Sequence, residues 1–203
     1  MGTDAMSEPA VVHLYLDDAP VESAGVVRLD IAVSQEPFVD LRGSAPDRPH
    51  FAGLSWTADA MSGALGDRGW HAERHIVWDD GPGDTDPTGW IKQVSLVRRR
   101  PDIDVDTFAA RYRGHGEVAR AHHGMFRYAQ TLLAEPVHGV ADDDQRVDGI
   151  SELWFVDRAA WRETFYVGPD SAAAVRADTE TFIDFATTRS AIVMEWPAMG
   201  SRP

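Results

Sequence analysis

One carboxylate in the C-terminal half of the chain stands in an otherwise apolar segment, where it could act as a general acid or base. The segment Ile150 to Val156 alternates as a strand does, which places Glu152 and Trp154 on the same face. Both faces are mostly apolar, so we expect both to be covered by other parts of the fold. Burial disfavours a charged carboxylate, and the pKa of Glu152 is therefore expected to be raised. The alternative is a structural ion pair between Glu152 and Arg127 or another cation.

A histidine in a predicted helix is a second candidate for proton transfer. His115 lies between Gly114 and Gly116, which suggest a break in the helix, and it shares a helical face with Phe108 and Tyr112. A neutral imidazole at such a position could take or give a proton near neutral pH. The alternative is a buried histidine whose nitrogen is satisfied by a backbone carbonyl.

Further polar and aromatic side chains could line a binding site. Tyr128 and Gln130 share one face of a predicted strand over Phe126 to Leu133, and Tyr128 could either orient a carbonyl or pack in the core. His122 and His123 could line a pocket. Alternatively, they could be placed at the C-terminus of a helix because the helix dipole favours histidine there. The candidate catalytic residues are His115, Glu152 and Tyr128, and the candidate substrate-binding residues are Tyr112, Arg127, Gln130, Trp154, His122 and His123.

Motifs for metals and cofactors are not found in the sequence. There is no cysteine, no HExxH and no pair of histidines at helical spacing, so no metal site is predicted. The glycine-rich nucleotide motifs and GxSxG are also missing. We therefore expect no cofactor, although haem stays open because His115, His122 or His123 could serve as its proximal ligand.

The charge of the chain bears on its partners. With 19 Lys and Arg against 33 Asp and Glu, the 203 residues carry a formal net charge of -14, and the only basic run is Arg98 to Arg100. A nucleic-acid binder needs clustered cations to neutralise phosphates, so nucleic acid is not an expected partner. The acidic N-terminus does not resemble a signal peptide, and no segment is apolar enough to span a bilayer. These features predict a cytoplasmic protein that does not bind membranes.

A stretch rich in Gly, Pro and Asp divides the chain into two predicted halves. We expect one half over residues 1–79, a linker over 80–89 and a second half over 90–197. The second half has the pattern of a βαββαβ module, with a helix N-cap at Asp104 and another at Asp157. The first half is fainter, with predicted strands at residues 11–16, 26–33, 51–56 and 73–78 and a predicted short helix at 58–65.

Several segments of the second half, in this order and spacing, resemble the EthD family. They are Phe108 to Gly116, Gly124 to Tyr128, Asp148 to Phe155, and the later residues Phe165, Pro169, Asp178 and Phe182. The resemblance implies the dimeric α/β-barrel group, in which two ferredoxin-like sheets enclose a pocket for an apolar or aromatic molecule. The predicted fold class is accordingly α+β, with two ferredoxin-like βαββαβ modules of which the first is degenerate. Either one chain closes this barrel or a homodimer does.

Three functions fit these expectations. The first is a cofactor-independent cyclase, lyase or decarboxylase acting on a polyketide or aromatic metabolite, in which His115 and Glu152 move protons while Tyr128 polarises a carbonyl. The second is an oxygenase or haem-binding enzyme of the same fold. The third is a non-catalytic carrier of a hydrophobic metabolite. Fold analogy alone does not select among them.

Overall fold

The structure is a computed structural model of the chain, and it describes residues 8–23, 25–33, 51–58, 64–83, 89–140 and 146–197. Within these residues the chain forms strands and helices in the order β1 (Glu8–Tyr15), β2 (Val26–Ala32), β3 (Gly53–Thr57), β4 (Arg68–Asp79), β5 (Ile91–Val97), α1 (Val105–His122), β6 (Arg127–His138), β7 (Gly149–Phe155), α2 (Arg158–Thr164), α3 (Ser171–Thr179) and β8 (Arg189–Pro197).

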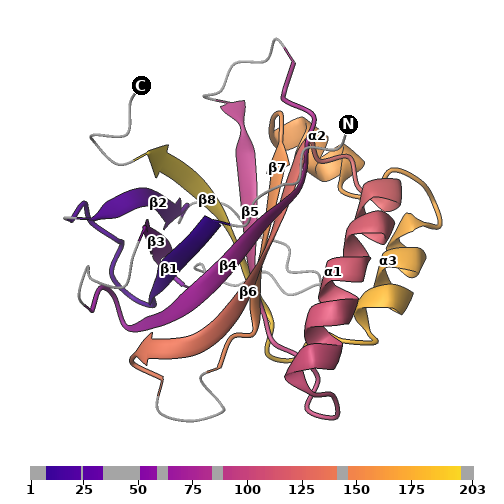
Figure 1. Cartoon of the computed structure of the whole chain (residues 1–203). Coiled ribbons are helices and arrows are strands. Elements are labelled where there is room, and N and C mark those ends of the chain that lie inside the picture. The colour runs from indigo at the N-terminus through magenta and orange to yellow at the C-terminus, as the bar shows by residue number, and fades with distance from the viewer. Residues whose placement is uncertain are drawn as a thin grey trace.

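The strands form one closed antiparallel barrel (Figure 1). Their order around the barrel is β1-β3-β2-β8-β5-β7-β6-β4, so each half of the chain contributes four adjacent strands in the same spatial arrangement. The two halves are joined by hydrogen bonds at two seams, β2 with β8 and β4 with β6. A single chain therefore closes the barrel, and closure does not need a second copy.

The predicted fold class is wrong. Instead of two ferredoxin-like α+β modules facing each other, the described residues form a single eight-stranded antiparallel barrel with all three helices in the second half. Alternation of side chains predicted where strands run, but it carries no information on which strand edges pair, and the pairing across the two seams makes one sheet of both halves. The predicted helix at 58–65 lies mostly outside the described residues.

The helices lie together on one side of the barrel (Figure 1). As predicted, α1 begins at Asp104, whose carboxylate accepts a hydrogen bond of 2.7 Å from Thr107 N. The predicted break near His115 is wrong, because α1 is continuous through both glycines. Gly116 has a packing role instead, since a Cβ atom there would lie 2.8 Å from Cγ1 of Val77 on β4. A small residue lets the helix approach the sheet closely.

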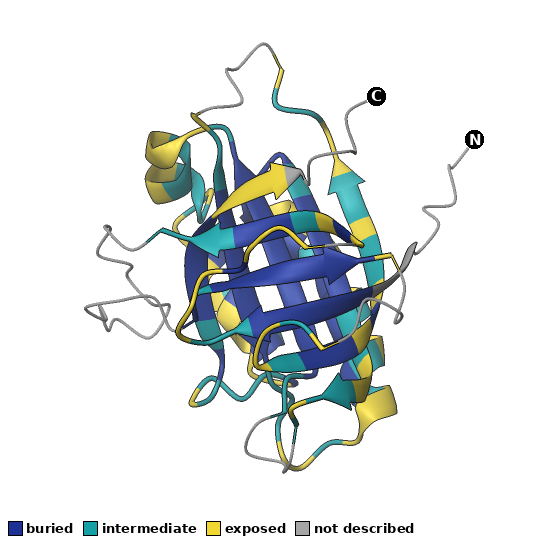
Figure 2. Ribbon diagram, turned by 90° about the vertical axis from the view of Figure 1, so that its left-hand side faces the viewer, coloured by how far each residue is buried: buried dark blue, intermediate teal, exposed yellow. Residues whose placement is uncertain are grey.

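The barrel interior is divided between apolar and charged side chains. Figure 2 shows that most strand residues are buried. An apolar cluster fills part of the lumen with side chains from several strands, among them Leu54, Trp70, Val94, Ile150 and Val193. Charged side chains of β2, β4, β5, β7 and β8 fill another part, and they are described below. Among the described helices, none combines the length and apolar character that a membrane crossing requires.

Candidate functional site

Strand β7 supplies a polar side chain to each side of the sheet. Ser151 faces α1, where Tyr112 contacts it, and its neighbour Glu152 faces the barrel lumen, where it meets cations of three other strands. This is the alternation that the sequence predicted. It defines two groups of residues, the helix-side network of Tyr112, His115, Tyr128, Gln130, Ser151 and Asp178, and the lumen network of Arg28, Asp30, Arg74, Lys92, Glu152 and Glu195.

Apart from the carboxylate of Asp178, the helix-side network is built from neutral hydrogen-bonding groups. The Tyr112 hydroxyl lies 2.7 Å from Ser151 Oγ, and Gln130 Nε2 donates to the Tyr128 hydroxyl over 3.2 Å. Burial raises the pKa of Tyr128 to about 12 and also raises the pKa of Tyr112, so both phenols stay protonated at neutral pH. Gln130 Oε1 is buried and finds no hydrogen-bond partner among the described residues. The network therefore places hydroxyl and amide donors, together with the carbonyl oxygen of Gln130 as an acceptor, between α1 and the sheet.

His115 is oriented by a carboxylate of α3. Its Nδ1 atom lies 2.7 Å from Asp178 Oδ2, and its ring also contacts those of Phe182 and Tyr128. Burial lowers the pKa of His115 although Asp178 opposes the shift, so the imidazole is neutral at pH 7. When Nδ1–H donates to Asp178, the other nitrogen, Nε2, carries the lone pair that can accept a proton. The partner of this histidine is thus a carboxylate and not the backbone carbonyl of the alternative interpretation.

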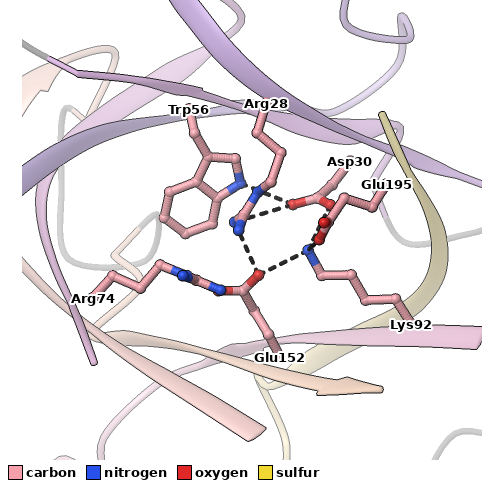
Figure 3. A network of polar contacts seen from close by, with 7 residues as sticks. All are labelled: Arg28, Asp30, Trp56, Arg74, Lys92, Glu152 and Glu195. Atoms are coloured by element: carbon pink, nitrogen blue, oxygen red, sulfur yellow. Dashed lines mark hydrogen bonds and ion pairs between the residues drawn. The ribbon is translucent and has the colours of Figure 1, made fainter. Parts of the chain in front are cut away.

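The lumen network is built from full charges (Figure 3). Glu152 accepts a hydrogen bond of 2.7 Å from Arg74 Nε, and its other oxygen lies 2.9 Å from Arg28 Nη2 and 2.8 Å from Lys92 Nζ. Lys92 Nζ also lies 2.6 Å from Asp30 Oδ1 and 2.7 Å from Glu195 Oε2. Three cations and three carboxylates therefore balance each other inside the barrel.

The expected rise in the pKa of Glu152 is wrong. Burial does raise this pKa, but the charges of Arg28, Lys92 and Arg74 outweigh burial and hold the pKa well below its usual range. Glu152 is consequently ionised at any working pH and is a poor proton donor or acceptor. The structure agrees with the alternative of an ion pair, although the partners are not Arg127, which pairs with Asp79.

The remaining predicted residues lie either on the lumen side of the sheet or between the helical segments. Trp154 belongs to the lumen side, where its ring centre lies 4.7 Å from Lys92 Nζ and 5.3 Å from Arg127 Cζ. His123 contacts the Phe165 carbonyl and His122 contacts Ser171 Oγ, so both attach α1 to the segment that carries α2 and α3. Among the described residues, no group of three or more His, Asp or Glu side chains is placed to hold a metal ion.

The structure thus brings together only part of the predicted site. Four of its residues, His115, Tyr128, Tyr112 and Gln130, meet between α1 and the sheet, whereas Glu152, Trp154 and Arg127 lie on the other face. Sequence reasoning did not assign Asp178 or Ser151 to the site, and it missed the lumen partners of Glu152. Charged side chains on the inward face of a strand, such as Arg28 and Asp30 on β2, were the available signal for the lumen network.

Comparisons with known proteins support the resemblance seen in the sequence. No curated protein matches the chain. A solved structure described as "Crystal structure study of anthrone oxidase-like protein" superposes with a TM-score of 0.51 at 12% identity, over 98% of this chain and 97% of the other. At 12% identity this similarity is evidence about the fold alone. Residues 100–186 match the family model of the EthD domain. The second half of the chain therefore carries an EthD domain, as its sequence predicted.

Proposed function

We propose that the protein is an enzyme of small-molecule metabolism in which His115 removes a proton from an aromatic or polyketide-type substrate. The observation that carries the proposal is the 2.7 Å contact between His115 Nδ1 and Asp178, on an imidazole whose lowered pKa keeps it neutral. A base held in one tautomer by a carboxylate is a recurrent arrangement for proton transfer. The EthD match adds support, because residues 100–186 include every member of the helix-side network.

The helix-side network suits this chemistry better than the lumen network does. The groups around Glu152 are ionised and balanced, and five of the six members of the lumen network lie outside the matched residues. On the helix side, by contrast, His115 can gain a proton while the buried phenols keep theirs. The side chain of His115 is 9% exposed and that of Asp178 is 33% exposed, so the pair reaches solvent.

The proposed step forms an enolate. His115 Nε2 takes the proton from a carbon next to a carbonyl, and the electrons of the broken C–H bond move into the carbonyl group. Asp178 stabilises the imidazolium that results, and the protonated hydroxyl of Tyr128 donates to the enolate oxygen. Cyclases, lyases and decarboxylases of aromatic metabolites share such an anion, so the proposal does not depend on which bond changes next.

A second function, that of an oxygenase, is favoured by one observation. The solved structure that superposes over 98% of this chain is described as anthrone oxidase-like. An enolate of an aromatic ketone is also the species that would react with oxygen, so His115 and Asp178 would keep the same roles. The two functions differ only in whether oxygen is consumed after proton removal.

Anthrone is a suitable probe for both functions, because it is an aromatic ketone with an acidic methylene group. Under nitrogen in D₂O, NMR would follow the exchange of the methylene protons. We expect His115→Gln to lower the enzyme-catalysed exchange rate about a hundredfold and Asp178→Asn to lower it about tenfold. In air, an oxygen electrode would report whether the anion is then oxidised.

The matched controls are His71→Gln, at an exposed position of β4, and Asp170→Asn, at the N-cap of α3 where no capping hydrogen bond is made. Both should exchange anthrone at the wild-type rate. Wild-type exchange in His115→Gln would contradict the proposed base.

A further inference from the structure

A row of three residues crosses three neighbouring strands on the outer face of the barrel, outside both networks. His13 on β1 lies opposite Gly69 on β4, and Gly69 lies opposite His138 on β6. Val12 and Leu14 belong to the apolar cluster of the lumen, so alternation along β1 turns His13 to the outer face. The two histidines are 125 residues apart in the chain, and therefore a local sequence motif cannot reveal them.

The glycine in the middle of this row lets the two imidazoles meet above β4. Two strands that flank a third are separated by about 9–10 Å, so their side chains touch only by reaching across the middle strand. His13 Nδ1 lies 3.1 Å from His138 Nε2, and the two ring planes differ by 22°. A Cβ atom at residue 69 would lie 2.6 Å from His138 Nε2 and 3.0 Å from His13 Nδ1, so a larger residue there would push the pair apart.

The histidine pair has the properties of nitrogen ligands for a metal ion. His13 is 1% exposed, and burial together with His138 lowers its pKa to about 4, although the Leu65 carbonyl opposes the shift. The imidazole is therefore neutral at pH 7, as a metal ligand must be. His138 is half-buried, so an ion can reach the pair from its side. Two nitrogens bound to one tetrahedral zinc ion lie roughly 3.3–3.4 Å apart, close to the 3.1 Å observed here.

We propose that His13 and His138 bind one divalent transition-metal ion of the zinc type, which clamps the first half of the barrel to the second. Imidazole suits such ions, whereas Mg²⁺ and Ca²⁺ prefer oxygen ligands. No third His, Asp or Glu side chain of the described residues is placed to join the pair, so water completes the coordination. The affinity is accordingly lower than that of a structural zinc site with four protein ligands.

The clamp follows from the positions of the two ligands. His13 is on β1 in the first half of the chain, and His138 is on β6 in the second half. These strands do not pair with each other, because β4 lies between them, and β4 with β6 is one of the two seams. An ion held by both imidazoles adds a bond across the end of that seam.

The first experiment is calorimetric titration of the untagged full chain with ZnCl₂ at pH 7, with MgCl₂ for comparison. We expect saturable binding of one Zn²⁺ per chain and no saturable binding of Mg²⁺. His138→Gln should weaken the affinity for Zn²⁺ at least about a hundredfold, because losing even an outer-shell partner of a metal costs about 10–100-fold. His75→Gln, which removes another half-buried histidine from β4, is the matched control and should bind as wild type does.

NMR of the histidine rings identifies the ligands in the wild-type chain, so the test does not depend on any variant folding. In long-range ¹H–¹⁵N spectra, Zn²⁺ should shift Nδ1 of His13 and Nε2 of His138. Gly69→Ala keeps both histidines but separates them, and it should weaken Zn²⁺ binding at least about tenfold.

Thermal unfolding tests the clamp itself. An ion that binds the folded barrel raises the unfolding temperature, so Zn²⁺ should raise it in wild type and in His75→Gln but not in His138→Gln, and EDTA should reverse the rise. Three results would overturn the site: no saturable Zn²⁺ binding, wild-type affinity in His138→Gln, or shifts confined to other histidine rings. Binding at the pair without a rise in the unfolding temperature would overturn the clamp.

Discussion

The helix-side network and the lumen network begin at adjacent residues of one strand, yet they are opposite in electrostatic character. Ser151 belongs to a network with two phenols, an amide and a neutral imidazole. Glu152 belongs to a network with three cations and two further carboxylates. His115 of the first network is a neutral imidazole that can gain a proton, whereas the cations of the second network keep Glu152 ionised. The comparison shows that a buried charge is not by itself a sign of chemistry, because strong pairing removes its freedom to titrate.

The two networks also differ in which parts of the chain they join. The helix-side network lies within the second half and connects α1, α3, β6 and β7. The lumen network joins β2 and β4 of the first half to β5, β7 and β8 of the second. We therefore expect damage to the lumen network to appear as lost stability, and damage to the helix-side network to appear mainly as lost turnover.

Glu152→Gln should give the largest change in stability. It leaves Arg28, Arg74 and Lys92 without their shared carboxylate, and removing one partner of a buried ion pair costs about 3–5 kcal/mol. Urea unfolding followed by tryptophan fluorescence measures the loss. Glu163→Gln, at an exposed position of α2, is the matched control and should cost nothing measurable. A loss below about 1 kcal/mol would place Glu152 among weakly coupled surface pairs.

Acidification should act through buried histidines and leave Glu152 ionised, because the neighbouring cations hold its pKa well below its usual range. Burial lowers the pKa of His123 from 6.5 to about 4, so between these pH values the unfolded chain binds more protons than the folded one. The destabilisation caused by His123 is therefore absent above about pH 6.5 and grows as the pH falls to about 4. His123→Gln should remove about 2 kcal/mol of this loss.

Urea midpoints at pH 7 and pH 4.5 measure the effect of acidification, with His71→Gln as the control at an exposed position. The same loss in wild type and His123→Gln would show that other groups control acid stability.

Tyr112→Phe should give the smallest change. It removes the 2.7 Å hydrogen bond to Ser151 Oγ and leaves a buried hydroxyl with one partner fewer, at a cost of about 1 kcal/mol. Thermal unfolding should show a shift of a few degrees, and Ser151→Ala should give a similar one. The double variant should cost less than the sum of the two, because both changes remove the same bond. Strict additivity would mean that this hydrogen bond does not couple the helix to the sheet.

Local features of the second half could be predicted from the sequence because they depend on nearby residues. The caps at Asp104 and Asp157 and the shared strand face of Tyr128 and Gln130 follow from short-range spacing, and the structure confirms them. The role of Gly116 could not be predicted, because its reason is a contact with Val77 on a distant strand.

The site itself was predictable only in part, for the same reason. Asp178 lies 63 residues from His115, and Arg74 lies 78 residues from Glu152. The sign of the pKa shift of Glu152 depends on partners of this kind, so burial alone predicted the wrong direction. Pairing of strand edges across the seams is likewise invisible to a local pattern, which is why the sequence left open whether one chain or two close the barrel.

Closure of the barrel by one chain has a consequence for how the protein is made. Strand β2 pairs with β8, the last described strand, so that Leu29 meets Trp196. During synthesis the first half emerges with one edge of β2 unpaired and with Arg28 and Asp30 lacking Lys92 and Glu152. Such long-range contacts have a high entropic cost and slow the folding reaction. We expect this half to depend on chaperones until β8 has left the ribosome, and to be the part of a nascent chain most prone to aggregate.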